Sequence, residues 1–500
     1  MPHLLGLDVG TTNTKAVVYD LEGRVCAEAS AATPLREEGP GLATRDPEAV
    51  YETATGVIRR AAAQVRPAEV LGLSISSMGE SGAPLDARGQ PVFPIIAWYD
   101  RRTLAYRQWW QSYFGDDRLF AICGLQPGHI FSLNKIMWLR DHEPAAYQRL
   151  KLWLSVSDYI AYRLCGVPAM SYPQACRTMA FDLRTLGWSA EVLAAAGVSP
   201  EVFPRPVPSG QALGTLRPEA AEACGLPRST VVAAGGHDHI CAAVAAAVTQ
   251  PGPVLDSVGT TEAAMAVIEH PRTEPAVRAL GLSCGAHAVP GRYYLIGGLL
   301  GIGPLVSWLV ETLFELPAGA EGYMALTEAA RESPPGARGL YMLPFLAGAG
   351  SPEQDPRATG ALLGLRLHHT RGDIARAALE GVCYELRRLL ESLNSVTGAT
   401  ESVLRAVGGG ARNAFWLQLR ADVTGRVLQV PEGTERAALG AALLGGVGAG
   451  AYASVEEAAA SAYRVAQVYR PDGAAHRDYS ARYEGTYRRL HQAALLVQAE

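Results

Sequence analysis

Short apolar runs along this chain alternate with longer segments whose apolar residues recur at helical spacing. Runs of strand length occupy residues 70–74, 230–233, 293–296, 403–407 and 427–430. Longer segments typical of helices occupy residues 47–63, 239–248, 373–393 and 411–424. In the third of these, small and apolar side chains share one face at the 3.6-residue period of a packed helix. This alternation predicts an α/β fold with a partly parallel sheet.

One short motif occurs twice, once in each half of the chain. Residues 7–12 are Leu-Asp-Val-Gly-Thr-Thr, and residues 256–261 are Asp-Ser-Val-Gly-Thr-Thr. Each copy follows a short apolar segment and precedes a strand-like one, which is typical of a hairpin with glycine in its turn. The four identical residues alone carry little weight. Together with their matching flanks and placement, they predict two related halves.

The chain is expected to divide just before the second copy of the motif. Residues 249–253, Thr-Gln-Pro-Gly-Pro, combine several residues that interrupt helices and strands. A chain of 500 residues exceeds one ordinary core, so two domains are expected. We predict an N-terminal domain at residues 1–250 and a C-terminal domain at residues 251–500. The tail from residue 455 onward is expected to be short and helical.

Composition and charge narrow the class of protein. Hydrophobic residues make up 48% and charged residues 19% of the chain, which is typical of a globular protein. A net charge of −5 gives no reason to expect a nucleic-acid or membrane-surface partner. The eight cysteines form no Cys-x-x-Cys pair, and the N-terminus does not resemble a signal peptide. No run approaches the about 20 apolar residues of a membrane helix, so we expect a cytoplasmic protein.

The glycine-threonine hairpin suits phosphate and metal chemistry. Glycine allows close approach, while threonine hydroxyls and backbone N–H groups donate to phosphate oxygens. Asp8 is a candidate Mg²⁺ ligand because Mg²⁺ prefers oxygen donors, and Lys15 is a candidate phosphate-facing cation. The alternative is an ordinary hairpin whose side chains satisfy local backbone groups. No Gly-x-x-x-x-Gly-Lys-Ser/Thr loop occurs in the sequence, so P-loop chemistry is not indicated.

A second candidate site lies at residues 235–239, Gly-Gly-His-Asp-His, between an apolar run and an alanine-rich helix. An Asp at this junction suits a general base that takes the proton of a substrate hydroxyl as the hydroxyl attacks phosphorus. Helix N-terminal N–H groups also favour anions there. The sequence leaves open that Asp238 only caps the helix. His237 and His239 also allow a transition-metal site, although the spacing suggests no third or fourth ligand.

Two further segments carry candidate binding groups. Residues 407–413, Val-Gly-Gly-Gly-Ala-Arg-Asn, would let adenine or a phosphate approach the backbone, with Asn413 as donor and acceptor. A carboxylate near an aromatic ring suits a polyol, although Glu80 and Trp98 are also compatible with a surface Glu and a core Trp. The predicted substrate-binding residues are Met78, Gly79, Glu80, Trp98, Asp100, Asp238 and His239.

The order of these segments resembles the FGGY family of carbohydrate kinases, within the actin–Hsp70–sugar kinase superfamily. The resemblance runs from residue 4 to residue 450, nearly the whole chain. Four stretches carry it: residues 8–15 (Asp-Val-Gly-Thr-Thr-Asn-Thr-Lys), 131–139 (Phe-Ser-Leu-Asn-Lys-Ile-Met-Trp-Leu), 235–238 (Gly-Gly-His-Asp) and 408–413 (Gly-Gly-Gly-Ala-Arg-Asn) with the helix that follows.

The resemblance implies two ribonuclease-H-like domains with sugar and ATP in the cleft between them. It implies that Asp238 is the general base and that Asp8, together with Asp238, lies at the Mg²⁺ site. It leaves a homodimer open. The nucleotide-binding positions of the family fall on Gly10, Thr11, Thr12, Lys15, Gly259, Thr260, Gly303, Gly409, Gly410 and Asn413.

Some positions depart from the better-known branches of the family. Glu80 falls where glycerol kinases have a hydroxyl-binding Glu, but the preceding position, Arg in glycerol kinases and His in xylulokinases, is Gly79 here. Ile130 replaces a substrate-binding Tyr of glycerol kinases. These differences count against glycerol and leave xylulose open. The Gly-Gly-His-Asp stretch is most similar to the L-fuculose kinase branch, and His239 is a departure with no assigned role.

The leading hypothesis is ATP-dependent phosphorylation of a primary hydroxyl of a small ketose such as L-fuculose or xylulose. A nucleotide-dependent clamp of the Hsp70 type is compatible with the two hairpins but leaves Asp238 and Glu80 without a role. A sugar-sensing pseudokinase is disfavoured by the intact Asp8 and Asp238. The sequence does not determine which sugar is bound, because one or two side chains can change such a preference.

Overall fold

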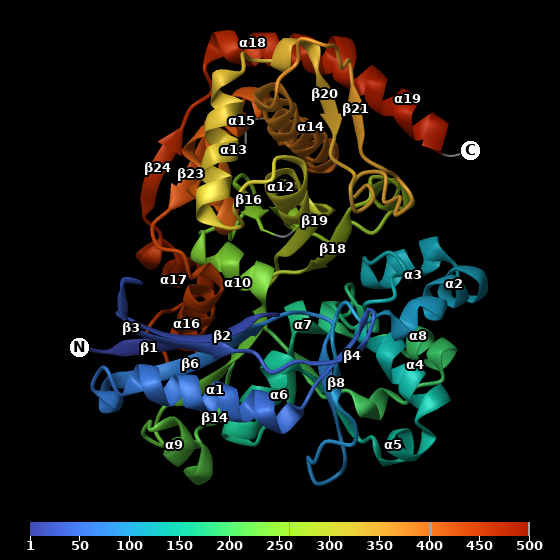
Figure 1. Ribbon diagram of the computed structural model, residues 1–500. Coiled ribbons are helices and arrows are strands. Elements are labelled where there is room, and N and C mark those ends of the chain that lie inside the picture. Colours follow the sequence, from blue (N-terminus) through green and yellow to red (C-terminus); the bar gives the residue numbers. More distant parts are fainter. Residues whose placement is uncertain (260, 400–402, 499–500) are drawn as a thin grey trace.

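Two mixed sheets form the centre of the molecule (Figure 1). The computed structural model describes residues 1–259, 261–399 and 403–498, with side chains described as far as residue 494. The first sheet has the order β14 (Ala212–Thr215), β15 (Val231–His237), β6 (Val70–Ser77), β1 (His3–Val9), β2 (Asn13–Tyr19) and β3 (Val25–Ala32). The second has the order β18 (Ser283–Ala286), β19 (Tyr293–Leu299), β17 (Glu262–Ile268), β16 (Val254–Val258), β22 (Leu404–Val407), β23 (Leu428–Pro431) and β24 (Val465–Tyr469).

The two sheets share one pairing pattern. β1 pairs antiparallel with β2 and parallel with β6, which pairs parallel with β15. In the same way, β16 pairs antiparallel with β17 and parallel with β22, which pairs parallel with β23. The repeated motif forms the first turn of each sheet: Gly10 N donates to Asn13 O at 2.9 Å, and Gly259 N donates to Thr261 O at 3.0 Å. The predicted relation between the two halves is confirmed.

Two helices built from small residues, α10 (Asp238–Ala245) and α16 (Arg436–Gly448), pack between the sheets. A Cβ added to Gly440 would lie 1.8 Å from the carbonyl oxygen of Cys241, and one added to Gly6 would lie 1.8 Å from that of Ala438. Only glycine allows this close approach. Figure 1 shows α16 and α17 (Val455–Ala462), in red, beside the blue strands of the first sheet. The C-terminal part of the chain therefore covers part of the first sheet.

The predicted helices form, with shifted ends. They are α1 (Pro47–Ala62), α10, α14 (Arg371–Thr397) and α15 (Ala414–Thr424). A capping box begins α14: the side chain of Thr370 accepts from the backbone N–H of Asp373, and the side chain of Asp373 accepts from the backbone N–H of Thr370. The start predicted for α15 at residue 411 is wrong, because residues 409–412 form a 3₁₀ turn and Asn413 caps the helix. None of the helices in the described ranges is long and apolar enough to cross a membrane.

The prediction of a helical tail from residue 455 onward is wrong in one segment. β24 lies between α17 and α18 (Gly473–Arg482) and pairs antiparallel with β23 at the edge of the second sheet. Its side chains are mostly exposed, so the segment lacks the apolar alternation that would have revealed a strand. Helix α19 (Arg488–Gln498) is the last element of the described residues.

A largely helical lobe is inserted between β6 and β15. Its helices are α2 (Leu104–Tyr113), α3 (Asp116–Cys123), α4 (Ser132–His142), α5 (Pro144–Arg149), α6 (Val156–Cys165), α7 (Tyr172–Cys176), α8 (Ala190–Ala196) and α9 (Pro218–Cys224). Short strands accompany it: β7 (Gly82–Leu85), β8 (Ile95–Ile96), β9 (Leu152–Ser155), β10 (Ala169–Ser171), β11 (Phe181–Asp182), β12 (Gly187–Trp188) and β13 (Arg205–Val207). β4 (Arg36–Gly39) and β5 (Leu42–Arg45) precede α1. The lobe supplies one side of the candidate site described below.

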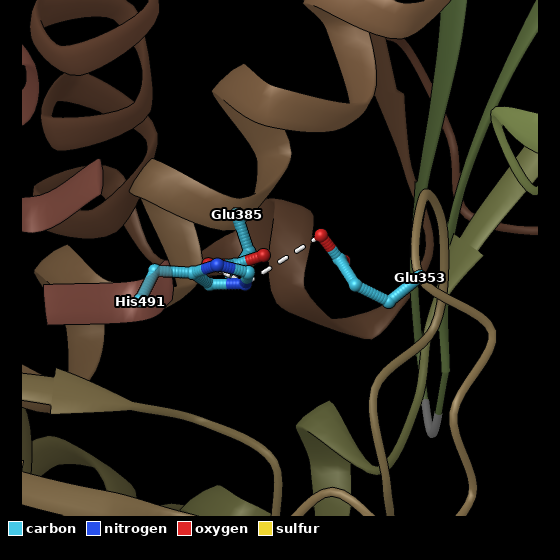
Figure 2. Close-up of side chains that lie close together, drawn as sticks. All are labelled: Glu353, Glu385 and His491. Carbon is cyan, nitrogen blue, oxygen red and sulfur yellow. Dashed lines mark ion pairs between the residues drawn. The ribbon is translucent and has the colours of Figure 1, made fainter. Parts of the chain in front are cut away.

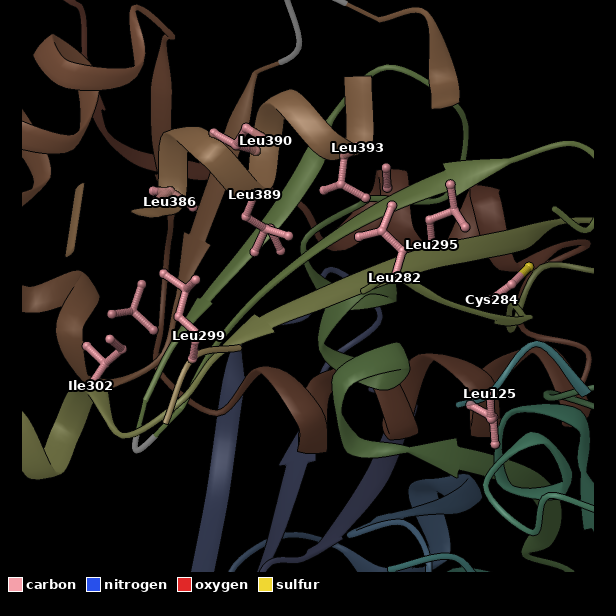
Figure 3. Close-up of a cluster of buried hydrophobic side chains, with 14 of the residues drawn as sticks. Leu125, Leu282, Cys284, Leu295, Leu299, Ile302, Leu386, Leu389, Leu390 and Leu393 are labelled. Carbon is pink, nitrogen blue, oxygen red and sulfur yellow. The ribbon is translucent and has the colours of Figure 1, made fainter. Parts of the chain in front are cut away.

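The long helix α14 packs on the second sheet. Figure 3 shows Leu386, Leu389 and Leu393 of this helix near Leu295 and Leu299 of β19. All of these side chains are buried, and each contributes about 1.5–3 kcal/mol by leaving water. The remaining elements of this half are α11 (Pro275–Ala279), α12 (Ile302–Trp308), α13 (Ala320–Glu332), β20 (Tyr341–Leu343) and β21 (Ala361–Leu363).

Candidate functional site

A cavity of about 320 Å³ lies where strand ends of the two sheets meet. From the first half it is lined by Thr11, Met78, Gly79, Glu80, Trp98, Ile130, Arg177, His237, Asp238 and His239. From the second half it is lined by Thr261, Ala263, Gly281, Ser283, Tyr294, Ile296, Gly297, Gly298, Ser351 and Gln354. Both Gly-Thr-Thr turns thus contribute a threonine to one cavity. Six of the seven predicted substrate-binding residues line it, and Asp100 is the exception.

Asp238 begins α10 directly after β15. Its Oδ1 accepts a hydrogen bond from the backbone N–H of His239 at 2.7 Å and lies 3.1 Å from Nε2 of His237. Burial, reinforced by the charge of Glu80, raises the pKa of Asp238, while His239 and Arg177 act in the opposite direction. The site therefore holds a carboxylate of increased basicity, as a general base requires.

The sequence left two alternatives open for this segment: helix capping by Asp238 and transition-metal binding by His237 and His239. The N-cap position of α10 belongs to His237, which makes no capping hydrogen bond, and Asp238 lies within the helix, so the interpretation of Asp238 as the cap is wrong. Burial lowers the pKa of His237 well below its usual value, and the nearby Arg177 and His239 lower it further. Among the residues that the structure describes, His237 and His239 do not belong to a cluster of three or more His, Cys, Asp or Glu side chains of the kind that holds a transition metal.

Asp8 of β1 faces the same region as Asp238. Its Oδ1 accepts a hydrogen bond at 2.5 Å from the hydroxyl of Ser76, on the neighbouring strand β6. Burial, together with the charges of Asp238 and Glu435, raises the pKa of Asp8 to about 7, against the lowering effects of Ser76 and Lys15. The ammonium of Lys15 lies 2.7 Å from Oε1 of Glu435. The charge of Asp238 thus reaches Asp8, and both side chains offer the hard carboxylate oxygens that Mg²⁺ prefers.

The raised pKa of Asp8 predicts that the protein loses stability as the pH rises. The pKa of Asp8 is about 7 in the folded protein against 3.8 for the free side chain, so the folded state retains a proton that the unfolded state has released. The contribution of Asp8 to the free energy of unfolding therefore falls across this window, by at most about 1.4 kcal/mol per pH unit. Asp8→Asn is expected to reduce this slope and to raise stability at neutral pH.

Unfolding by urea, measured without divalent cations at about pH 5 and about pH 7, checks this expectation. Asp478→Asn, a change at an exposed carboxylate of α18, is the matched control and should keep the wild-type slope. Equal slopes for wild type and Asp8→Asn would contradict the stated environment of Asp8.

The predicted nucleotide-binding residues fall into two groups. Gly10, Thr11 and Thr12 belong to the β1–β2 turn and Gly259 to the β16–β17 turn, whereas Thr260 lies outside the described residues. The second group, Gly303, Gly409, Gly410 and Asn413, does not line the cavity.

The glycine turn of the second group packs against the β16–β17 turn. A Cβ added to Gly410 would lie 2.3 Å from Val258 Cγ1, while one added to Gly409 would meet nothing within 4 Å. Asn413 caps α15 by accepting from Trp416 N at 3.1 Å, and its amide donates to the hydroxyl of Thr327 at 2.9 Å. The loop thus brings an open backbone surface next to the second Gly-Thr-Thr turn.

Glu80 is held in an unusual backbone conformation at the cavity. It has a φ of +62°, which costs a non-glycine residue on the order of 1 kcal/mol. Its carbonyl oxygen accepts from the hydroxyl of Ser132 at 3.0 Å and from the buried ammonium of Lys135 at 2.8 Å. Burial lowers the pKa of Lys135 to about 7. The stretch at residues 131–139 therefore fixes the backbone of Glu80 from α4.

Arg177 is a cavity residue that sequence reasoning missed. It follows α7, and its Nε donates to Oε1 of Glu80 at 2.6 Å, with a second contact through Nη2. Its guanidinium lies over the ring of Phe131 at 5.3 Å from the centroid. No spacing in the sequence joins residue 177 to residue 80, so only the fold reveals the pair.

Trp98 and Asp100 have different roles. The indole N–H of Trp98 donates to the hydroxyl of Thr11 at 3.1 Å, at the edge of the cavity. Asp100 is fully buried: its Oδ2 accepts from Ala43 N at 2.7 Å, and its Oδ1 accepts from Arg102 N at 2.9 Å. Both oxygens of Asp100 hold the chain around Trp98, so its predicted place at the substrate is corrected to a supporting one.

A separate cluster resembles a metal site by its donor atoms. Figure 2 shows Glu353, Glu385 of α14 and His491 of α19 facing one another, with donor atoms within 4.8 Å. Arg388 already lies among them: its Nη1 is 2.9 Å from Oε2 of Glu385, and it also pairs with Glu353 and His491. The guanidinium satisfies these groups, so the cluster is an ion-pair network. The network holds the loop at residues 351–354 through Glu353. Ser351 and Gln354 of this loop line the cavity.

Comparison with known proteins places both halves in one family. The models of the N-terminal and C-terminal domains of the FGGY family of carbohydrate kinases match residues 3–245 and 255–449. A xylulose kinase from Staphylococcus epidermidis is 30% identical, with 98% of this chain and 97% of the relative covered. An L-fuculokinase from Escherichia coli is 30% identical, with 94% and 97% covered. The crystal structure of a xylulose kinase from Rhodospirillum rubrum superposes with a TM-score of 0.92 at 29% identity and covers 100% of both chains.

Proposed function

Because this chain belongs to the FGGY family of carbohydrate kinases, we propose that it transfers the γ-phosphate of ATP to a primary hydroxyl of a small ketose, such as xylulose or L-fuculose. The observation that carries the proposal is the convergence of both Gly-Thr-Thr turns, Asp238 and Glu80 on one cavity. The two named ketoses are those of relatives that span nearly the whole chain.

Asp238 is proposed as the general base. Its carboxylate takes the proton of the substrate hydroxyl, the hydroxyl oxygen forms a bond to the γ-phosphorus, and the bond between that phosphorus and the β–γ bridging oxygen breaks to release ADP. The raised pKa of Asp238 supports this role because a more basic carboxylate accepts the proton more readily.

The glycine-threonine turns are proposed to hold the phosphates of ATP. Their backbone N–H groups and threonine hydroxyls, including Thr11 and Thr12 of the first turn, are suited to donate to phosphate oxygens. Asp8, with Asp238, would hold Mg²⁺ through its oxygens. When bound, Mg²⁺ neutralises phosphate charge. The open backbone at Gly409 is proposed to contact the adenine of ATP. Gly410, Gly303 and Asn413 are proposed for the same part of the nucleotide, because they match adenine-side positions of the family.

Glu80 and Trp98 are proposed to bind the sugar, the first by accepting hydrogen bonds from hydroxyls and the second by covering an apolar face. Met78, Gly79 and His239 complete that side of the cavity. Both intact carboxylates, Asp8 and Asp238, argue for turnover, and no observation favours a sensor or clamp. Since ATP and small ketoses are cytoplasmic metabolites, we also propose a cytoplasmic site of action.

A coupled assay of ADP release tests the proposal, with Mg²⁺-ATP and a panel of ketopentoses, ketohexoses, deoxyketoses, polyols and aldonates. We expect strong stimulation by one ketose and little by glycerol. A folded protein that binds ATP and releases no ADP with any ketose would contradict the proposal.

A further inference from the structure

A side chain at position 79 would crowd the side chains that already lie beside it. A Cβ added to Gly79 would lie 3.0 Å from Cγ of Arg177 and 3.0 Å from Cδ2 of His237. At that separation the neighbouring side chain has to move. The space beside Glu80 is therefore filled from two distant elements, the end of α7 and the end of β15.

The guanidinium of Arg177 has a fixed orientation. Nε and Nη2 contact the carboxylate of Glu80, and the ring of Phe131 lies beneath the group. The side chain of Arg177 is 14% exposed, and that of Glu80 is 6% exposed. Within the described residues, Nη1 of Arg177 donates to no acceptor of the chain, although Arg177 lines the cavity.

We propose that Arg177 determines sugar specificity: its free N–H groups donate to a sugar hydroxyl whose own proton is accepted by Glu80. An arginine has five N–H donors, and a carboxylate has acceptor sites beyond those used in one ion pair. A paired donor and acceptor suit hydroxyl groups, which both donate and accept. This inference rests on the proposed function and assigns to the same site a residue and a substrate class.

The charges around the pair indicate a neutral substrate. Glu80 already compensates Arg177, so the pair offers no free positive charge to an anionic substrate, and two further carboxyl groups, Asp238 and Asp8, lie in the same region. A sugar acid would place its own carboxylate among these groups, next to the phosphates of ATP. Arg177 is therefore assigned to neutral sugars, and aldonates are expected to be poor substrates.

The first test compares wild type with Arg177→Met, using the ketose that gives the strongest ADP release. We expect the KM for the sugar to rise about tenfold to hundredfold, because a hydrogen bond from a charged group is lost, while the KM for ATP stays within about twofold. An unchanged sugar KM, or sugar and ATP KM values that rise together, would overturn the assignment.

Because Arg177→Met leaves Glu80 buried without its partner, a second variant guards against misfolding. Glu80→Gln with Arg177→Met removes both charges, and it should keep wild-type affinity for ATP while its sugar KM remains raised. Wild-type sugar KM in this folded variant would overturn the proposal. An inactive wild type would instead count against the proposed function itself.

A positional exchange is the sharpest test. Arg177→Gly alone removes the guanidinium, and Gly79→Arg alone forces two side chains into one space, so both should raise the sugar KM. Gly79→Arg combined with Arg177→Gly returns a guanidinium to the same space from the neighbouring backbone. We expect the combined variant to have a sugar KM at least about threefold lower than Arg177→Gly. Additive losses in the combined variant would overturn the proposal.

Discussion

Asp238→Asn is expected to lower kcat by at least about a thousandfold, because it removes the proposed acceptor of the substrate proton. Asparagine keeps the shape of the side chain and can still accept from the backbone N–H of His239, which lies 2.7 Å from Oδ1 in the wild type. Binding of ATP, measured by calorimetry, should therefore persist. Steady-state ADP release with the preferred ketose gives the change in kcat.

Asp478→Asn is the matched control for this variant as well. It makes the same chemical change at an exposed carboxylate on α18, far along the chain from the cavity residues, and should leave kcat unchanged. Turnover by Asp238→Asn within about tenfold of wild type would remove Asp238 from the role of general base.

The second large effect concerns stability. Arg420 of α15 is fully buried and binds Glu262 through two hydrogen bonds of 2.6 and 2.8 Å, with a third of 3.2 Å to Asp256. These residues join α15 to β16 and β17. Burial, together with the charge of Glu262, raises the pKa of Asp256 to about 8, against the opposing effect of Arg420. Arg420→Met would leave the charge of Glu262 buried without a partner, so we expect a loss of about 3–5 kcal/mol in the free energy of unfolding.

Urea unfolding of Arg420→Met beside Arg470→Met checks that value. Arg470 is exposed, and its substitution should change stability by less than about 0.5 kcal/mol. Adding Glu262→Gln to Arg420→Met should recover part of the loss, because the unpaired charge is then gone. A loss below about 1 kcal/mol in Arg420→Met would show that the buried pair does not hold these elements together.

The elements with strong local signals could be predicted from the sequence. The apolar period of α14, the breakers before β16 and the two Gly-Thr-Thr turns each specify local structure through a few neighbouring residues. β24 could not be predicted in this way, because it is a mostly exposed edge strand whose pairing with β23 depends on the rest of the sheet.

Some residues of the candidate site could likewise be predicted from local motifs, and others could not. Asp8, Asp238 and Glu80 belong to motifs, and all three could be named before the fold was known. Arg177 could not, because it meets Glu80 only after the lobe between β6 and β15 has folded. The prediction for Asp100 was wrong because closeness in the sequence does not give the direction of a side chain. Its position beside Trp98 in the sequence suggested the cavity, whereas its carboxylate turns inward to the backbone of Ala43.

The most direct measurement is the structure of the product formed from ATP and the preferred ketose, determined by mass spectrometry and by phosphorus NMR with coupling to protons. We expect the sugar to gain one phosphoryl group on a primary carbon, in amounts equal to the ADP released. Release of inorganic phosphate with an unmodified sugar would contradict phosphoryl transfer to the sugar, whatever the rate of ADP release.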